Sequence, residues 1–327
     1  MVDDSDIISL VVGSIAAGVS LLSIYLNRKN NIELEKIKSE FELKKDEQAA
    51  IRNYEYEARQ RLYKEFEPLL FLLVEHGESA YRRIFDLART AKHGNLEPDD
   101  GWLKNNEYFK ISTIHRLLLP LAVFTLMQRR LTTFDLDLVP YYKVQYSLSK
   151  GLYFTFADDY SLATSSPKID YDPDRFPKKY KKQGIYRGVI DNLVEALITY
   201  EANGNPRLLS YGEFEKKYLQ SYNQEPFATI STMFHNFHPR TMPVLWRILI
   251  VQAHIYTAVK AAREKKDSKS ATQLKTIRVM SEAERKLFDW RKSPQESEDS
   301  EVFNTFEGVE NYLQDKMGEY TESKINE

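Results

Sequence analysis

The feature that most constrains this chain is an uncharged run of twenty residues close to its N-terminus, residues 7–26. A helix of this length covers about 30 Å, the thickness of the hydrocarbon core of a bilayer. The mean hydropathy of the whole chain is nonetheless −0.51, so the rest of it is markedly polar. The sequence therefore predicts one transmembrane helix, residues 7–26, attached to a soluble region.

The charges on either side of this run predict its orientation. The charged residues that precede it are all acidic (Asp3, Asp4 and Asp6), which also argues against a cleaved signal peptide. Basic residues follow it closely: Arg28, Lys29, Lys36, Lys38, Lys44 and Lys45. Because basic flanks stay in the cytoplasm, we expect residues 1–6 outside the inner (plasma) membrane and the C-terminal region in the cytoplasm. The chain has no cysteine, which is compatible with a reducing compartment.

Small side chains recur along one face of the expected span, at alternating spacings of four and three. A face of this kind lets two helices approach closely in lipid, so it predicts self-association. The same spacing continues beyond the membrane through three apolar residues and then becomes polar at Lys44 and Gln48. The residues expected to carry self-association are Ser9, Gly13, Ala16, Ala17, Ser20, Leu34, Ile37 and Phe41.

No glycine or proline interrupts residues 28–67, which predicts a helical neck over residues 27–67. We interpret the neck as a short coiled coil, although its apolar seam is shorter than the three or four heptads of a strong one. A single solvated helix is the alternative interpretation. Pro68 is expected either to kink this helix or to start a new one.

The remaining chain carries apolar side chains at helical spacing almost throughout, which predicts an all-α fold. We expect an α-helical cytoplasmic domain over residues 68–292, followed by an acidic linker and a C-terminal helix within residues 293–327. Ser210 and Ser281 each stand three residues before a glutamate, the pattern of a capping box at a helix start. Further helices are expected over residues 108–127, 140–162, 185–200, 244–262, 281–290 and 306–317.

Two more apolar stretches, residues 117–127 and 244–262, could be mistaken for membrane spans. Pro120 interrupts the first of them, and the second contains Arg247 and Lys260. Since a charge at the centre of a span costs roughly 2.5–3.5 kcal/mol on insertion scales, we expect both stretches in the domain core.

Candidate chemical groups are few. His235 and His238 are three residues apart and could share a helix face, as metal ligands do, but no third ligand stands at a typical spacing. We therefore expect a capping or packed pair. The carboxylate pairs Asp158–Asp159 and Asp135-x-Asp137 are typical of solvated turns or helix ends. Common hydrolase, nucleotide-binding and dinucleotide-binding motifs are absent from the sequence, so we expect no catalytic residue, no cofactor and no metal.

One basic cluster stands out on a proline-flanked segment: Lys178, Lys179, Lys181 and Lys182 surround Tyr180. These lysines are expected to contact anionic lipid or phosphate, since each lysine near an anionic leaflet contributes about 1 kcal/mol. Nucleic acid is the competing anion. The balance of 46 basic and 48 acidic residues argues against a dedicated nucleic-acid binder. A solvated loop, with its charge offset by the preceding aspartates, is the third interpretation.

The segment of residues 59–75 reads RQRLYKEFEPLLFLLVE, an Arg/Tyr-rich helix that runs into a Pro-Leu-Leu turn. Placed after a single span and a charged helix, it resembles uncharacterised prokaryotic single-pass membrane-anchored proteins with a helical cytoplasmic domain. The resemblance covers about the first third of the chain and includes no catalytic residue. Its layout is similar to that of membrane effectors of antiviral defence systems, and this implies activation of a membrane protein by a soluble sensor.

These features favour a non-enzymatic, membrane-anchored interaction or effector module that self-associates and binds a soluble protein partner. Its expected partners are copies of itself, a soluble protein and membrane lipids. The expected output is recruitment or perturbation of the membrane, the latter in antiviral defence (abortive infection). The alternatives are a membrane-tethered hydrolase or nuclease on an all-α scaffold, and a passive membrane scaffold.

Overall fold

The computed structural model describes residues 4–96, 101–131, 135–165, 168–171, 182–235, 237–264, 281–288, 305–313 and 316. The chain divides into two compact units, Met1–Gln60 and Arg61–Glu327. The predicted all-α fold is confirmed, because the described elements are helices apart from one two-stranded hairpin.

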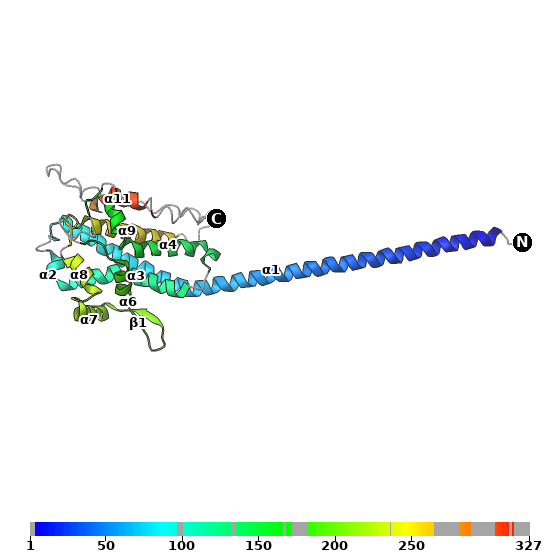
Figure 1. Ribbon diagram of the computed structural model, residues 1–327, viewed down its shortest axis with the longest axis horizontal. Helices are drawn as coiled ribbons and strands as arrows, with labels where there is room; N and C mark the ends of the chain where they lie inside the picture. The colour runs from blue at the N-terminus through cyan, green and yellow to red at the C-terminus, as the bar shows by residue number, and fades with distance from the viewer. Residues whose placement is uncertain are drawn as a thin grey trace. The chain divides into compact units, whose positions relative to one another are not determined.

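The elements follow one another along the chain as Figure 1 labels and colours them. The helices are α1 (Asp4–Lys92), α2 (Trp102–Asn105), α3 (Glu107–Leu131), the 3₁₀ helix η1 (Leu136–Leu138), α4 (Pro140–Thr155), α5 (Asp159–Thr164), α6 (Arg187–Glu195), α7 (Tyr211–Ser221), α8 (Phe227–His235), α9 (Pro243–Glu264), α10 (Glu282–Phe288) and α11 (Thr305–Tyr312). The strands are β1 (Ile198–Tyr200) and β2 (Pro206–Leu208).

The first unit consists of the N-terminal part of α1. Its most apolar window has a mean hydropathy of 2.0 and is 0% buried, so the helix is long and apolar enough to cross a membrane. Two serine hydroxyls in this window bond within the helix: Ser14 donates to the carbonyl of Leu10 (2.8 Å), and Ser20 to that of Ala16 (2.9 Å). Because an unpaired hydroxyl is costly in an apolar medium, this bonding makes the serines compatible with a span.

From Arg61 onwards α1 belongs to the second unit and buries one face. Most of its buried residues recur at spacings of three, four or seven, the spacing of an apolar stripe on one helix face: Leu62, Phe66, Leu70, Leu73, Ala80, Ile84, Leu87, Ala88 and Ala91. The helix continues through Pro68, so the alternative of a new helix beginning there is wrong. Pro68 lies on the exposed side, where water can hydrate the carbonyl of Lys64 that lacks an amide partner.

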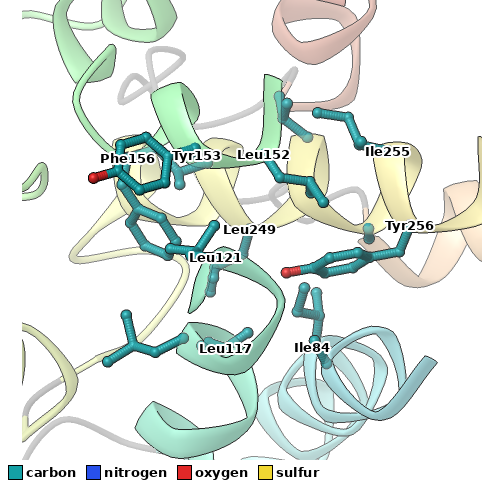
Figure 2. Packing of buried hydrophobic residues seen from close by; sticks show 14 of the residues in the cluster. Ile84, Leu117, Leu121, Leu152, Tyr153, Phe156, Leu249, Ile255 and Tyr256 are labelled. Carbon is teal, nitrogen blue, oxygen red and sulfur yellow. The ribbon is translucent and has the colours of Figure 1, made fainter. Parts of the chain in front are cut away.

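The core of the second unit is built around α3, α4 and α9. Helix α9 packs against α4 and α5, and α3 packs against α4. Figure 2 shows side chains of these helices meeting α1: Ile84 of α1, Leu117 and Leu121 of α3, Leu152 of α4, and Leu249 and Tyr256 of α9. The apolar window of α3 is 83% buried, and most of α9 is buried as well. Both stretches are therefore core helices, as predicted.

Helices α1 and α9 approach each other closely at Gly77. A Cβ atom at this position would lie 3.0 Å from Cδ1 of Tyr256. The tyrosine is 4% exposed, and its hydroxyl donates to Oε1 of Gln252 at 2.7 Å. The absence of a side chain at Gly77 thus allows the Tyr256 ring to pack directly against α1.

The hairpin corrects one expectation from the sequence. The helix expected over residues 185–200 ends at Glu195, and Ile198–Tyr200 forms β1, which pairs antiparallel with β2. The three residues of β1 are β-branched or aromatic, types that favour a strand over a helix. Gly204 closes the connection with a φ of +80°, a conformation that favours glycine.

The helix expected over residues 140–162 is likewise divided, into α4 and α5. The break is a turn in which Ala157 and Asp158 donate their backbone N–H groups to the carbonyls of Phe154 (3.0 Å) and Thr155 (3.2 Å). The Asp158 carboxylate accepts the hydroxyl of Ser161 at 2.5 Å. Aspartate side chains near a helix start commonly form such local bonds in place of the backbone bonds of a continuous helix.

Both capping boxes are confirmed. At the start of α7 the Ser210 hydroxyl oxygen accepts the backbone N–H of Glu213, and the Glu213 carboxylate accepts that of Ser210. At the start of α10 the Ser281 oxygen accepts the backbone N–H of Glu284 at 3.3 Å, and Oε2 of Glu284 accepts that of Ser281 at 2.7 Å. The other oxygen of Glu284 accepts the hydroxyl of Tyr81 at 2.5 Å, which ties α10 to α1.

The C-terminal helix α11 is docked on α9 and α5. It buries Val309, Tyr312 and Leu313. Gly308 lies against a fully buried arginine, since a Cβ there would be 2.7 Å from Cζ of Arg247. Nη1 of Arg247 donates to the carbonyls of Leu162 (2.6 Å) and Ser165 (3.1 Å) at the C-terminal end of α5, where a cation is favoured. Burial lowers the pKa of Arg247 to about 10, so the guanidinium stays charged at neutral pH.

Candidate functional site

The residues expected to carry self-association lie exposed along α1. Their positions are Ser9, Gly13, Ala16, Ala17, Ser20, Leu34, Ile37 and Phe41. Gly13 and Gly18 would meet nothing within 4 Å if they carried a Cβ atom. Leu34, Ile37 and Phe41 are 52%, 66% and 69% exposed. This face is therefore open in the single chain, and self-association through it stays a prediction.

The lysine cluster falls mostly outside the described residues, because this is where Lys178, Lys179 and Lys181 lie. Lys182 is described, and its Nζ lies 3.6 Å from the centroid of the Tyr186 ring. Its charge also acts to lower the pKa of the Asp159 carboxyl. The predicted contact with anionic lipid or phosphate stays a prediction.

The two histidines, His235 and His238, lie at the end of α8 and just after it. His235 is the last residue of α8, whereas His238 is 2% exposed, and its Nδ1 accepts the backbone N–H of Arg240 at 3.0 Å. Within the described ranges, no group of three His, Cys, Asp or Glu residues is placed to hold a metal ion.

The paired carboxylates divide between half-buried and exposed positions. Asp158 accepts the hydroxyl of Tyr312 at 2.8 Å, and Asp159 accepts that of Tyr171 at 2.6 Å. Burial raises the pKa of Asp159 above its usual value, and the bond from Tyr171 opposes this shift. Asp158 and Asp159 stand at the start of α5 and are half-buried, which agrees with the expected helix end, and each also bonds to a tyrosine distant in sequence. Asp135 is exposed, and the side chain of Asp137 is outside the described part.

A pocket of about 300 Å³ opens between α1, α9 and α10. Its charged lining residues bond to one another. Glu78 accepts from Arg82 at 2.6 Å and from Lys260 at 3.5 Å, and Tyr81 donates to Glu284. Each carboxylate of the lining is thus already bonded to another lining residue, and the positive and negative charges of the pocket balance each other.

A second group of side chains gathers where α1, α2, α3 and α7 contribute residues. We name it the Arg83 cluster, and it consists of Arg83, Trp102, Tyr108, Phe109, Ser112, His115, Arg116 and Tyr211. The Arg83 guanidinium donates from Nη2 to Oγ of Ser112 at 3.1 Å. Its Cζ lies 5.7 Å from the centroid of the Trp102 ring, a cation–π contact.

Helix α3 positions most of this cluster. Tyr108, Ser112 and His115 stand four and three residues apart, a spacing that places them on one face. The Tyr108 ring lies edge-on to Tyr211 of α7 at 5.6 Å. His115 packs beside Phe214 at 4.9 Å, and its Nε2 lies 3.4 Å from the carbonyl oxygen of Leu209. The face thus brings α7 against α3 through aromatic contacts.

The electrostatics of the cluster are dominated by positive charge and burial. Burial lowers the pKa of Arg83, and the charge of Arg116 lowers it further, whereas Asp86 acts in the opposite direction. Burial lowers the pKa of His115 to about 4, with smaller effects from His76 and Arg116. At neutral pH the cluster therefore contains two guanidinium groups and an uncharged imidazole.

Sequence reasoning missed this cluster. Its residues come from four separate segments, and none of them forms a motif with its neighbours in the sequence. The available signal was the spacing of Tyr108, Ser112 and His115 along α3, which marks a mixed polar and aromatic face on an otherwise apolar helix.

Comparisons with protein-family models, with curated proteins and with solved structures found no match.

Proposed function

We propose that this protein is a membrane-anchored, non-enzymatic interaction module. The observation that carries the proposal is the N-terminal segment of α1, which is uncharged over residues 7–26 and has a 0% buried apolar window. Apolar surface in water is unfavourable by about 25 cal/mol per Å², so this segment favours a bilayer or a second chain as its cover. The second unit has its own core and would meet a soluble protein partner.

The proposed location is the inner (plasma) membrane, with residues 1–6 outside and the second unit in the cytoplasm. The charge asymmetry around the segment supports this orientation, since acidic residues precede it and Arg28 and Lys29 follow it. A reporter fused after Glu327 should be found in the cytoplasm, and one before Met1 outside. A C-terminal reporter found outside would contradict the proposed topology.

The proposed mode of assembly is contact between the small-residue faces of two or more spans. Gly13 has open space around it in the single chain, so a larger side chain there meets no obstacle within the same molecule. A change in association caused by Gly13→Leu would therefore report on contact between chains. The exposed neck residues Leu34, Ile37 and Phe41 would continue this contact beyond the membrane.

The experiment compares two leucine substitutions in the span by crosslinking in membranes. Gly13→Leu should weaken the oligomer, because its bulk holds the helices apart, while insertion is retained because leucine favours lipid. Val11→Leu adds bulk on the opposite side of the helix and should leave the oligomer unchanged. Adding Ile37→Lys to Gly13→Leu should leave mostly monomers. Equal crosslinking of all four proteins would refute association through this face.

The proposed output of the assembly is recruitment of a partner or perturbation of the membrane, as the layout of antiviral membrane effectors implies. Expression in bacteria with a potential-sensitive dye tests the second possibility. Loss of membrane potential in the wild type and its recovery in the Gly13→Leu, Ile37→Lys variant would support perturbation. Unchanged potential and growth in both would limit the function to recruitment.

A further inference from the structure

Among the described residues, the Arg83 cluster contains two arginines and no carboxylate that forms an ion pair with them. In the part of the chain that the structure describes, neither Arg83 nor Arg116 forms an ion pair. The acid that acts on Arg83 is Asp86, which bonds to Arg89 at 3.3 Å. An anion between the two guanidinium groups would replace their mutual repulsion by attraction to a shared partner.

Two buried donors in the cluster also lack acceptors. Nε of Arg83 and Nε1 of Trp102 are both buried, and neither has a hydrogen-bond partner. The two side chains are in contact, and Arg83 is 6% exposed. Buried donors are nearly always satisfied in folded proteins, and exceptions commonly mark the place of a water molecule or an ion. The orphaned donors and the unbalanced charge thus point to the same missing acceptor.

The accessible edge of the cluster is aromatic. Tyr108 is 50% exposed and Phe109 is 37% exposed, and their rings meet at 5.3 Å. Phe109 in turn meets Trp102 at 5.0 Å. Exposed rings beside arginines are the surface on which nucleobases stack, since every base has a flat π-face.

Two acids of α3 and α7 have partners of their own. Glu215 accepts the hydroxyl of Tyr211 at 2.9 Å, and Glu107 lies 3.9 Å from Nζ of Lys110. Among the described residues, neither acid forms an ion pair with Arg83 or Arg116. Arginine presents a planar fork that matches the oxygens of a phosphate group.

We infer that the Arg83 cluster binds a small phosphate-bearing ligand with an aromatic base, that is, a nucleotide. Arg116 and the edge of Arg83 hold the phosphate, and Tyr108 and Phe109 carry the base. The site is independent of the proposed membrane anchor, because its residues all belong to the second unit. A bound nucleotide would link helices α1, α2, α3 and α7 and thereby stabilise the second unit.

The test measures binding of ADP, inorganic phosphate and adenosine to the full chain in detergent by isothermal titration calorimetry. ADP should bind more tightly than either of the other two, because it engages both parts of the site. Arg116→Gln should weaken ADP binding about tenfold or more, since it removes charge-assisted bonds to the phosphate. Arg82→Gln is the matched control, because Arg82 is exposed and paired with Glu78; it should leave the ADP affinity unchanged.

A second variant separates the two halves of the site and does not depend on a buried residue. Tyr108→Ala changes a half-exposed ring, so the fold should persist, as circular dichroism can verify. It should weaken ADP binding while leaving the affinity for inorganic phosphate unchanged. Equal affinities of ADP and inorganic phosphate in the wild type would overturn the assignment of a base-binding surface.

The chain itself could supply the anion from the acidic residues Glu97, Asp99 and Asp100, which precede α2 in the sequence. A variant with Gln, Asn and Asn at these positions tests this alternative. If ADP binds the wild type and depends on Arg116, the inference holds. If ADP binds only the triple variant, or binds neither protein in the millimolar range, the inference is overturned.

Discussion

In the described part of the chain, two helices are long and apolar enough to cross a membrane, yet their surroundings differ completely. The N-terminal window of α1 has a mean hydropathy of 2.0 and is 0% buried, whereas that of α3 has a mean hydropathy of 1.3 and is 83% buried. Length and composition therefore do not decide what covers an apolar helix. The described part of the chain covers the apolar window of α3 and leaves that of α1 exposed.

The polar residues of the two helices show the same contrast. In the apolar segment of α1 they are serines, and Ser14 and Ser20 bond to their own helix. In α3 they include ionisable side chains with partners in the surrounding fold, such as His115 near the carbonyl of Leu209. A helix surrounded by lipid satisfies its polar groups internally, whereas a core helix can use distant neighbours.

The largest expected effect comes from a charge in the buried helix. Leu118 of α3 is 0% exposed, so Leu118→Asp places an unpaired carboxylate in the core. We expect a loss of about 4 kcal/mol or more in the free energy of unfolding, enough to unfold the second unit. Thermal unfolding followed by circular dichroism measures it. Leu219→Asp on the exposed face of α7, where Leu219 is 47% exposed, should change little.

The same kind of change in the exposed helix should act on membrane insertion and leave folding intact. Ile15→Lys puts a charge near the middle of the apolar segment, at a cost of roughly 2.5–3.5 kcal/mol on insertion scales. The fraction of protein in the membrane should fall, while the unfolding transition of the second unit stays the same. Ile15→Leu is the control for fractionation. Retention of the lysine variant in membranes at the wild-type level would undermine the contrast with α3.

Acid should destabilise the fold around the buried helix α3 through the imidazole of His115, a group for which the apolar segment of α1 has no counterpart. The pKa of His115 is about 4 when folded, because of burial, against an ordinary value of 6.5. Between pH 6.5 and about 4 the imidazole takes up a proton in the unfolded chain but not in the folded one. The free energy of unfolding is therefore highest above pH 6.5, and it falls as the pH drops towards 4. The full extent of this fall is roughly 3 kcal/mol. Urea unfolding at several pH values measures it, and His115→Gln should flatten the curve in this window; identical curves would refute the assignment.

The smallest effect compares two glycines within α1. Gly77→Leu forces a side chain towards the Tyr256 ring, and we expect a loss of about 1–3 kcal/mol in the free energy of unfolding. Gly13→Leu meets open space and should leave that free energy unchanged within about 0.5 kcal/mol. Urea unfolding of the two variants measures both. Equal destabilisation would mean that the N-terminal part of α1 is packed within its own chain.

Much of the fold could be predicted because its causes are local. The apolar stripe from Leu62 to Ala88 follows helical spacing, and the capping boxes at Ser210 and Ser281 need only a serine and a glutamate three residues on. The exclusion of residues 117–127 and 244–262 from the membrane followed from Pro120 and from charges within the second stretch. Each inference uses residues that are neighbours along one helix.

The errors arose where distant residues decide. The end of α6 was placed too late because the pairing of Ile198 with Leu208 replaces helical bonds. The single helix expected over residues 140–162 divides near Asp158 and Asp159, whose carboxylates accept the hydroxyls of Tyr312 and Tyr171. In each case the competing partner stands ten or more residues away in the sequence.

The sequence by itself determined that this protein is helical, that residues 7–26 are apolar enough to span a membrane, and where several helices begin. These properties depend on hydropathy and spacing within single segments. Only the tertiary structure decided that α3 is covered, that α1 passes Pro68 unbroken, and that Arg83, Trp102, Arg116 and Tyr211 belong to one cluster. The physical reason is that burial and charge balance depend on which segments fold against each other, and this is not encoded in any one of them.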